Sequence, residues 1–269
     1  MIKKTLMTIA IIEGIERSEG CSLCYLWGKS EKRHMEYLLT DEVTMSPEFR
    51  EKVKAAKGFC NHHMHLLYNT THQGNTEDGS GYALYMRDVV ERISKDLGSL
   101  PDCLGSLEDS ANSDILARRR RRRNAFSLLG NTVEHAVQGQ QPCPACESLW
   151  SLDQINLHTL VQMLDDKEFR EEFKSSKGLC LPHFVSAIRM AGRSKLKNPA
   201  HVARTLIEVE TKRLQLVEHY LSEFTRKQSW DFRHEPWGSE ANANPMVLNL
   251  LVGVKGLYCR SYKAFSPWE

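Results

Sequence analysis

The stretch SPEFREKVKAAKGFCNHH at residues 46–63 recurs as DKEFREEFKSSKGLCLPH at residues 166–183. In both copies a charged, amphipathic segment runs up to a glycine, and a Cys-x-x-His motif follows. Ser-Pro or Asp at the start and Gly at the stop are the residues that helix ends favour. The sequence therefore predicts two helices that end at Gly58 and Gly178, each leading into another helix that begins near the cysteine.

A Cys-x-x-Cys motif precedes each of these stretches, in GCSLC at residues 20–24 and in PCPAC at residues 142–146. The Cys-x-x-Cys motifs lie 122 positions apart and the Cys-x-x-His motifs 120 positions apart, so a two-residue deletion aligns them. Self-similarity of this kind indicates a duplicated unit. Apolar residues at three- and four-residue spacing around the motifs predict helices. The predicted fold class is all-α, a duplicated helical unit with a long C-terminal amphipathic helix.

The two motifs of each copy together supply three thiols and one imidazole. Two thiolates two residues apart can bind one ion from a single turn, and a Cys and a His three residues apart share one helix face. A Cys3His set suits structural zinc, whose four positions are all filled by protein. The predicted ligands of two Zn²⁺ sites are Cys21, Cys24, Cys60, His63, Cys143, Cys146, Cys180 and His183.

The pairing of the motifs and the identity of the metal stay open at this point. Ligation within each copy is the simplest geometry, but an exchange that gives the Cys-x-x-Cys of one copy the Cys-x-x-His of the other is an alternative. An iron-sulfur cluster also suits thiolate-rich sites. The plain alternative is a set of buried thiols and core histidines. A redox dithiol is a weaker one, because the strand-then-helix context of thioredoxin-like motifs is missing.

Several neighbouring residues are weaker candidates. His62 has no equivalent histidine in the second copy, and we interpret it as a surface or supporting residue rather than a ligand. Cys103 and Cys259 lack counterparts and are interpreted as free thiols. Glu36 and His158 align on the helices after the Cys-x-x-Cys motifs, where a solvated helix face is the simpler interpretation.

The composition adds limits on function. The chain has 36 basic and 34 acidic residues, a net charge of +2, which points to neither nucleic acid nor a membrane. No run is long and apolar enough to span a bilayer, and no signal-peptide cleavage site is evident, so we expect a cytoplasmic protein. The basic charge is concentrated in one run, which gives nucleic-acid binding as a weaker hypothesis. This run consists of Arg118, Arg119, Arg120, Arg121, Arg122 and Arg123.

The predicted organisation has four segments. The long C-terminal helix opens at Asn198 and Pro199, where a proline is favoured at the first helical position. The predicted segments are 1–70 with the first copy, 71–117 as a linker with one docked helix over 82–97, 118–192 with the arginine run and the second copy, and 193–269 with the long helix and the tail.

The sequence resembles an uncharacterised prokaryotic family catalogued as domain of unknown function 6062. The resemblance rests on GCSLC with KGFCNHH, on CPAC with KGLCLPH, on GYALYMRDVVERI and on the closing EFTRKQSWDFRHEPWGSE, in that order. It implies the paired Cys-x-x-Cys and Cys-x-x-His motifs as family features and carries no established activity. The chain departs from the family pattern after Gly238, in its arginine run and in its long linker.

Together these features predict a metal-binding module that acts as a binding or adaptor protein for an unidentified protein partner. An enzyme is the weaker prediction, because a closed four-ligand site offers no Lewis-acid position, and because the sequence contains no phosphate loop, nucleophile elbow or His-Glu-x-x-His motif. The alternative from another class is an iron-sulfur protein that transfers electrons or supports a redox enzyme.

Overall fold

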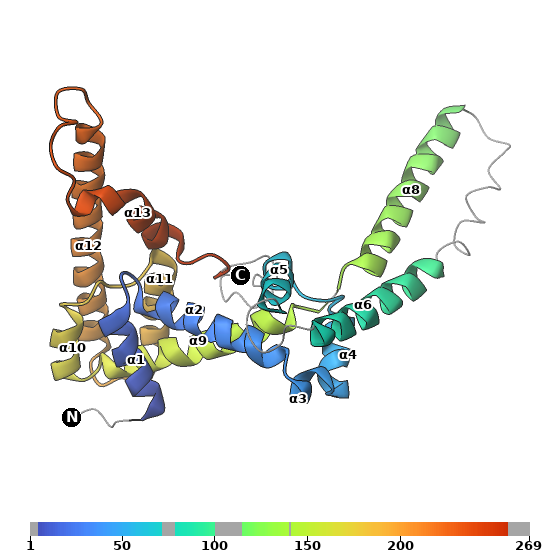
Figure 1. The fold of residues 1–269 in the computed structure, drawn as a ribbon, viewed down its shortest axis with the longest axis horizontal. Helices are drawn as coiled ribbons and strands as arrows, with labels where there is room; N and C mark the ends of the chain where they lie inside the picture. The colour runs from blue at the N-terminus through green and yellow to red at the C-terminus, as the bar shows by residue number, and fades with distance from the viewer. Residues whose placement is uncertain (1–4, 72–78, 100–114, 140, 258–269) are drawn as a thin grey trace. The chain divides into compact units, whose positions relative to one another are not determined.

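A computed structural model describes residues 5–71, 79–99, 115–139 and 141–257, and within these residues every regular element is a helix (Figure 1). The all-α prediction is confirmed. The helices are α1 (Leu6–Arg17), α2 (Ser22–Leu38), α3 (Asp41–Thr44), α4 (Pro47–Ala55), α5 (Asn61–Thr71), α6 (Ser80–Gly98), α8 (Ile115–Val137), α9 (Pro144–Met163), α10 (Lys167–Phe173), α11 (Leu181–Arg193), α12 (Pro199–Lys227), the 3-10 helix η2 (Ser239–Asn242) and α13 (Ala243–Val252).

The ends of α4 and α10 follow the predicted signals. The Ser46 hydroxyl accepts a hydrogen bond from the Phe49 N–H at 3.3 Å, and the Asp166 carboxylate caps α10 in the same way. These side chains satisfy backbone donors that the first turn of a helix leaves free. Gly58 and Gly178 then take positive φ angles of 102° and 71°. Because side chains with a Cβ rarely adopt this conformation, glycine allows the chain to turn there toward the next helix.

The chain divides into two compact units. Unit 1 comprises the described residues of Met1–Lys32 and Leu149–Leu257, and unit 2 those of Arg33–Ser148. The division falls inside α2 and α9, so each unit contains residues from both halves of the sequence. The four-segment organisation stays a prediction.

In unit 1, α12 packs against both α11 and α13 (Figure 1). Leu206, Val209 and Val217 of the predicted apolar face are buried, whereas Leu214 is 40% exposed. α12 begins at Pro199, as predicted. The tail beyond it contains η2 and α13, which the sequence pattern did not indicate because its apolar residues alternate with prolines, glycines and asparagines.

Unit 2 is organised around Tyr85 of α6. The Tyr85 side chain is fully buried, and its hydroxyl donates to the Leu38 carbonyl at 2.7 Å. The rings of Phe49 and Phe59 meet it edge-on, with centroids 5.8 and 6.0 Å away. The same core contains Cys143 and Cys146, so two of the predicted ligands lie inside the hydrophobic core of this unit.

Candidate metal centres

All four ligand motifs begin a helix. The carbonyl oxygen of the first cysteine in each motif accepts a hydrogen bond from the N–H four residues later, as in the first turn of a helix. The second ligand follows three residues on and therefore lies on the same face as the first. These bonds are Tyr25 N–H to Cys21 O at 3.1 Å, Met64 N–H to Cys60 O at 2.8 Å, Glu147 N–H to Cys143 O at 3.0 Å and Phe184 N–H to Cys180 O at 2.8 Å.

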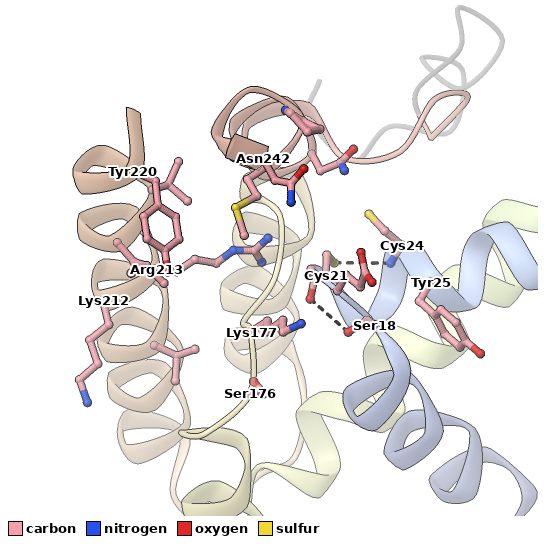
Figure 2. A pocket seen from close by; sticks show the side chains of 18 of the residues that line it. Ser18, Cys21, Cys24, Tyr25, Ser176, Lys177, Lys212, Arg213, Tyr220 and Asn242 are labelled. Atoms are coloured by element: carbon pink, nitrogen blue, oxygen red, sulfur yellow. Dashed lines mark hydrogen bonds between the residues drawn. The ribbon is translucent and has the colours of Figure 1, made fainter. Parts of the chain in front are cut away.

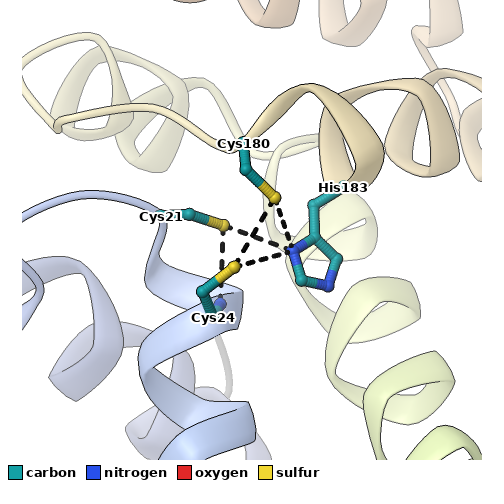
Figure 3. Close-up of side chains that lie close together, drawn as sticks. All are labelled: Cys21, Cys24, Cys180 and His183. Atoms are coloured by element: carbon teal, nitrogen blue, oxygen red, sulfur yellow. Dashed lines mark hydrogen bonds between the residues drawn. The ribbon is translucent and has the colours of Figure 1, made fainter. Parts of the chain in front are cut away.

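Site 1, in unit 1, consists of Cys21, Cys24, Cys180 and His183 (Figure 3). The cysteines Cys21 and Cys24 come from the start of α2, and Cys180 and His183 from the start of α11. The Nδ1 atom of His183 lies 3.4, 3.5 and 3.2 Å from the three sulfur atoms, in chain order, and the sulfurs of Cys24 and Cys180 are 3.5 Å apart. No side chain of this group is more than 5% exposed, so the group is closed to bulk water.

Site 2, in unit 2, consists of Cys60, His63, Cys143 and Cys146. The Nδ1 atom of His63 lies 3.3, 3.7 and 3.3 Å from the sulfurs of Cys60, Cys143 and Cys146. The sulfurs of Cys60 and Cys146 are 3.7 Å apart. Three of these residues are buried, and Cys60 is partly exposed. All eight predicted ligand residues therefore fall into two groups of the predicted composition.

The pairing of the motifs differs from the simplest expectation. Each group joins the Cys-x-x-Cys of one sequence copy to the Cys-x-x-His of the other, so ligation within a copy is not the arrangement found. The sequence left both pairings open, because sequence separation does not report which helix starts pack together. The contacts are instead set by helix packing, which joins the start of α2 to that of α11 in unit 1, and that of α9 to that of α5 in unit 2.

The spacing of the ligand atoms fits one tetrahedral ion. With zinc–sulfur bonds of about 2.3 Å and zinc–nitrogen bonds of about 2.0–2.1 Å, a tetrahedron places its sulfurs about 3.8 Å apart and sulfur and nitrogen about 3.6 Å apart. In the structure the nitrogen lies 3.2–3.7 Å from each sulfur, and the sulfurs of Cys24 and Cys180 and of Cys60 and Cys146 are 3.5 and 3.7 Å apart. All four atoms of each group lie within 4.8 Å of one another. The residues of both groups could therefore hold a metal ion.

The electrostatics of both groups favour at least one thiolate. Burial opposes ionisation of Cys21, but contacts with Cys180 and Cys24 and the charge on His183 lower the pKa of Cys21 well below its usual value. Hydrogen bonds with Cys146 and Cys60 likewise lower the pKa of Cys143 far below that of an ordinary thiol. Contacts with neighbouring thiols raise the pKa of Cys24 and Cys180 instead. Because the thiolate is the form that binds metal, each group thus has one thiol prepared for a cation.

Asp153 of α9 orients the imidazole of site 1. Its Oδ1 atom lies 3.1 Å from His183 Nε2, and both side chains are almost fully buried. A carboxylate on one ring nitrogen fixes the proton there and leaves the other nitrogen free to bind metal. Asp153 was not among the residues that the sequence pattern indicated. The signal that could have found it is an acidic residue in the equivalent position of the first copy, Glu31, 122 positions earlier.

Two further residues support site 1 from α12 and α13. The buried Glu210 accepts a hydrogen bond from the N–H of Leu179, the residue before Cys180, at 3.1 Å. Gly253 ends α13 with a φ of 75°, and a Cβ built there would lie 3.3 and 3.4 Å from the sulfurs of Cys180 and Cys24. The backbone at Gly253 thus covers the thiols closely. Neither residue carries a ligand-like pattern that sequence reasoning could detect.

The weaker candidates take no part in the two groups. His62 is partly exposed, with its ring 5.1 Å from that of His63, and Glu36 and His158 are exposed, as the solvated-face interpretation predicts. Cys103 and Cys259 lie outside the described residues.

The arginine run lies in the helix α8. Its residues Arg120 and Arg123 are exposed, and the side chains of the other four arginines are not described. Nucleic-acid binding through this run stays a prediction. In the part of the chain that the structure covers, no helix has both the length and the hydrophobicity for a bilayer span.

Comparison with known proteins places the chain in a family without giving it an activity. No curated protein and no solved structure matches the sequence. The model of the family described as "Family of unknown function (DUF6062)" matches residues 2–255, nearly the whole chain and both metal-ligand groups. The resemblance inferred from the paired motifs is thereby confirmed, and the chain belongs to the DUF6062 family of unknown function.

Proposed function

We propose that this chain is a zinc protein in which sites 1 and 2 each hold one structural ion and the helical scaffold serves as a binding or adaptor module. The observation that carries the proposal is the convergence of three sulfurs and one nitrogen in each group, all within 4.8 Å of one another, with the nitrogen 3.2–3.7 Å from each sulfur. Four protein ligands fill the coordination of zinc and leave no position for substrate. Each ion then joins two helix starts that are distant in the sequence.

A single ion is favoured over an iron-sulfur cluster by the same geometry. A cluster distributes its protein ligands over several iron atoms, so they approach from different sides of a larger object. Here all four ligand atoms of each group lie within 4.8 Å and surround one point. Zinc is the ion that most often takes a closed set of three cysteines and one histidine.

Metal content and the visible absorption spectrum of protein purified without oxygen test the metal assignment. We expect a colourless protein with two zinc ions per chain. The Cys60→Ser variant should retain about one ion and lose stability in unit 2, because structural metal binding contributes directly to folding. A brown protein with iron and acid-labile sulfide would support the electron-transfer alternative instead. Normal metal content in the Cys60→Ser variant would contradict the ligand assignment.

The adaptor role is supported by exposed aromatic side chains in the segment after α12. Trp230 is 72% exposed, with the Arg233 guanidinium stacked on its ring at 3.2 Å, and Trp237 is 46% exposed. Tryptophan and arginine are enriched where proteins bind one another. Trp237 also contacts the ring of Phe224 at 5.3 Å and lies under Lys227, but both tryptophans keep a large exposed area, so we propose this segment as the contact surface.

Comparative affinity purification tests the adaptor role. The zinc-loaded wild type is compared with a Trp230→Ala/Trp237→Ala variant and with a Tyr37→Ala control, in which an equally exposed ring (49%) is removed from unit 2. We expect a protein that the wild type and the control retain equally and the double variant loses. Equal retention by all three proteins would argue against this surface.

A further inference from the structure

A cavity of about 940 Å³ lies beside site 1 within unit 1, and Cys21 and Cys24 form part of its wall (Figure 2). The other walls come from the loop before α11, from α12, and from η2 and α13. Cavities of roughly 300–1,000 Å³ are the usual size for binding small molecules. This cavity is therefore large enough for a ligand, and the metal assignment leaves it without a role.

The charged residues around the cavity are mostly basic. Lys174, Lys177, Lys212 and Arg213 line it, against one acidic residue, Glu19. Lys174 forms an ion pair at 2.9 Å with Glu171, a residue outside the cavity lining. Lys177 and Lys212 form no ion pair with any described residue. Figure 2 shows Lys177 and Arg213 extending toward the side of the cavity where Cys21 lies. The free positive charge favours an anionic group.

The remaining wall is largely apolar. Val209, Val217 and Met246 contribute aliphatic side chains from α12 and α13, and Tyr25 and Tyr220 contribute aromatic rings. An inorganic ion would leave these surfaces in contact with water, whereas a molecule with an apolar body would cover them and gain the free energy of their burial.

We propose that this cavity binds a small amphipathic anion, a carboxylate, sulfonate or phosphate carried on an apolar or aromatic body. The anionic group lies near Lys177 and Arg213, and the body packs against α12 and α13. This inference goes beyond metal binding. The ion of site 1 would fix two walls of the cavity relative to each other, because it would join Cys21 and Cys24 to the loop that leads from Lys174 to Cys180.

Fluorescence titration of the zinc-loaded full chain tests this proposal. The probes are 8-anilinonaphthalene-1-sulfonate, an aromatic anion, and N-phenyl-1-naphthylamine, its neutral counterpart. The variant Lys177→Gln removes an exposed ammonium group that makes no ion pair with described residues, so its fold should be preserved. The control Lys195→Gln removes one exposed lysine from the loop after α11, outside the cavity lining.

We expect saturable binding of one sulfonate probe per chain, with the same Kd for wild type and control. The Lys177→Gln variant should bind it roughly two- to fivefold more weakly, the range expected for losing one solvated charge interaction. The neutral probe should bind wild type and variant equally and less tightly. Absence of saturable binding, an unchanged Kd in the variant, or tighter binding of the neutral probe would each overturn the proposal. Metal content is measured on the same samples, so a failure of probe binding in protein that holds its metal counts against this proposal alone, and missing metal counts against the zinc assignment.

Discussion

Replacing Asp153 by Ala should weaken metal binding at site 1 by about 10- to 100-fold and leave site 2 unchanged. The carboxylate lies 3.1 Å from His183 Nε2, with 6% of its side chain exposed and 1% of that of the histidine. Water therefore cannot readily replace it, and the ring N–H is left buried without an acceptor. A buried hydrogen bond to a charged group contributes about 1.5–3 kcal/mol, which corresponds to roughly 10- to 150-fold in affinity.

Competition between the protein and a zinc chelator gives the affinity of each site separately. In the Asp153→Ala variant the chelator should remove the ion of site 1 at a lower chelator concentration than in wild type. The ion of site 2 should be removed at the same concentration as in wild type. Asp153→Asn is the matched control, since an amide oxygen can still accept from the ring and the loss should be smaller. Unchanged release of both ions, or equal weakening of both, would refute the argument that Asp153 acts through His183.

Two further predictions concern the surroundings of site 1. Burial raises the pKa of Glu210 from 4.5 to about 7, so the folded state binds the carboxyl proton more tightly than the unfolded state does. The free energy of unfolding therefore falls by up to about 3 kcal/mol as the pH rises from 4.5 through 7. In urea denaturation of zinc-saturated protein, the free energy of unfolding of Glu210→Gln relative to wild type should therefore be higher at pH 8 than at pH 5. The same difference between the two proteins at pH 5 and at pH 8 would contradict this. Gly253→Ala should destabilise by about 1–3 kcal/mol and loosen site 1, because its φ is 75° and the new Cβ would lie 2.5 Å from Leu257. The control Gly192→Ala lies in α11 and its Cβ meets nothing within 4 Å, so it should leave thermal stability unchanged or raise it slightly, and equal losses in both variants would exclude steric contact as the cause.

The local elements were predictable because their signals are short-range. Ser46 and Asp166 cap helices through hydrogen bonds to residues two or three positions ahead, and Gly58 and Gly178 take the positive φ that their place after a helix indicates. The ligand residues were predictable for the same reason, since each motif lies within a single helical turn.

The pairing of the motifs was not predictable from the sequence. It depends on which helix starts pack together, and Cys24 meets Cys180 across 156 positions of chain. Glu210 was missed because a single buried carboxylate on a helix has no spacing pattern, and Asp153 has only the weak signal of its repeat equivalent Glu31. Only the folded packing reveals that each lies next to a ligand-bearing turn.

The central claim is that each metal ion takes its ligands from both copies of the motif pair, and zinc stoichiometry of two fourfold variants tests it most directly. Both variants change every Cys concerned to Ser and every His to Ala. One removes all of site 1, which is Cys21, Cys24, Cys180 and His183, and the other removes all ligands of the first copy, which is Cys21, Cys24, Cys60 and His63.

The exchanged pairing predicts one tightly bound zinc in the first variant, since site 2 stays whole, and none in the second, since each site keeps only two ligands. Ligation within each copy predicts the reverse. One zinc in the second variant and none in the first would contradict the exchanged pairing.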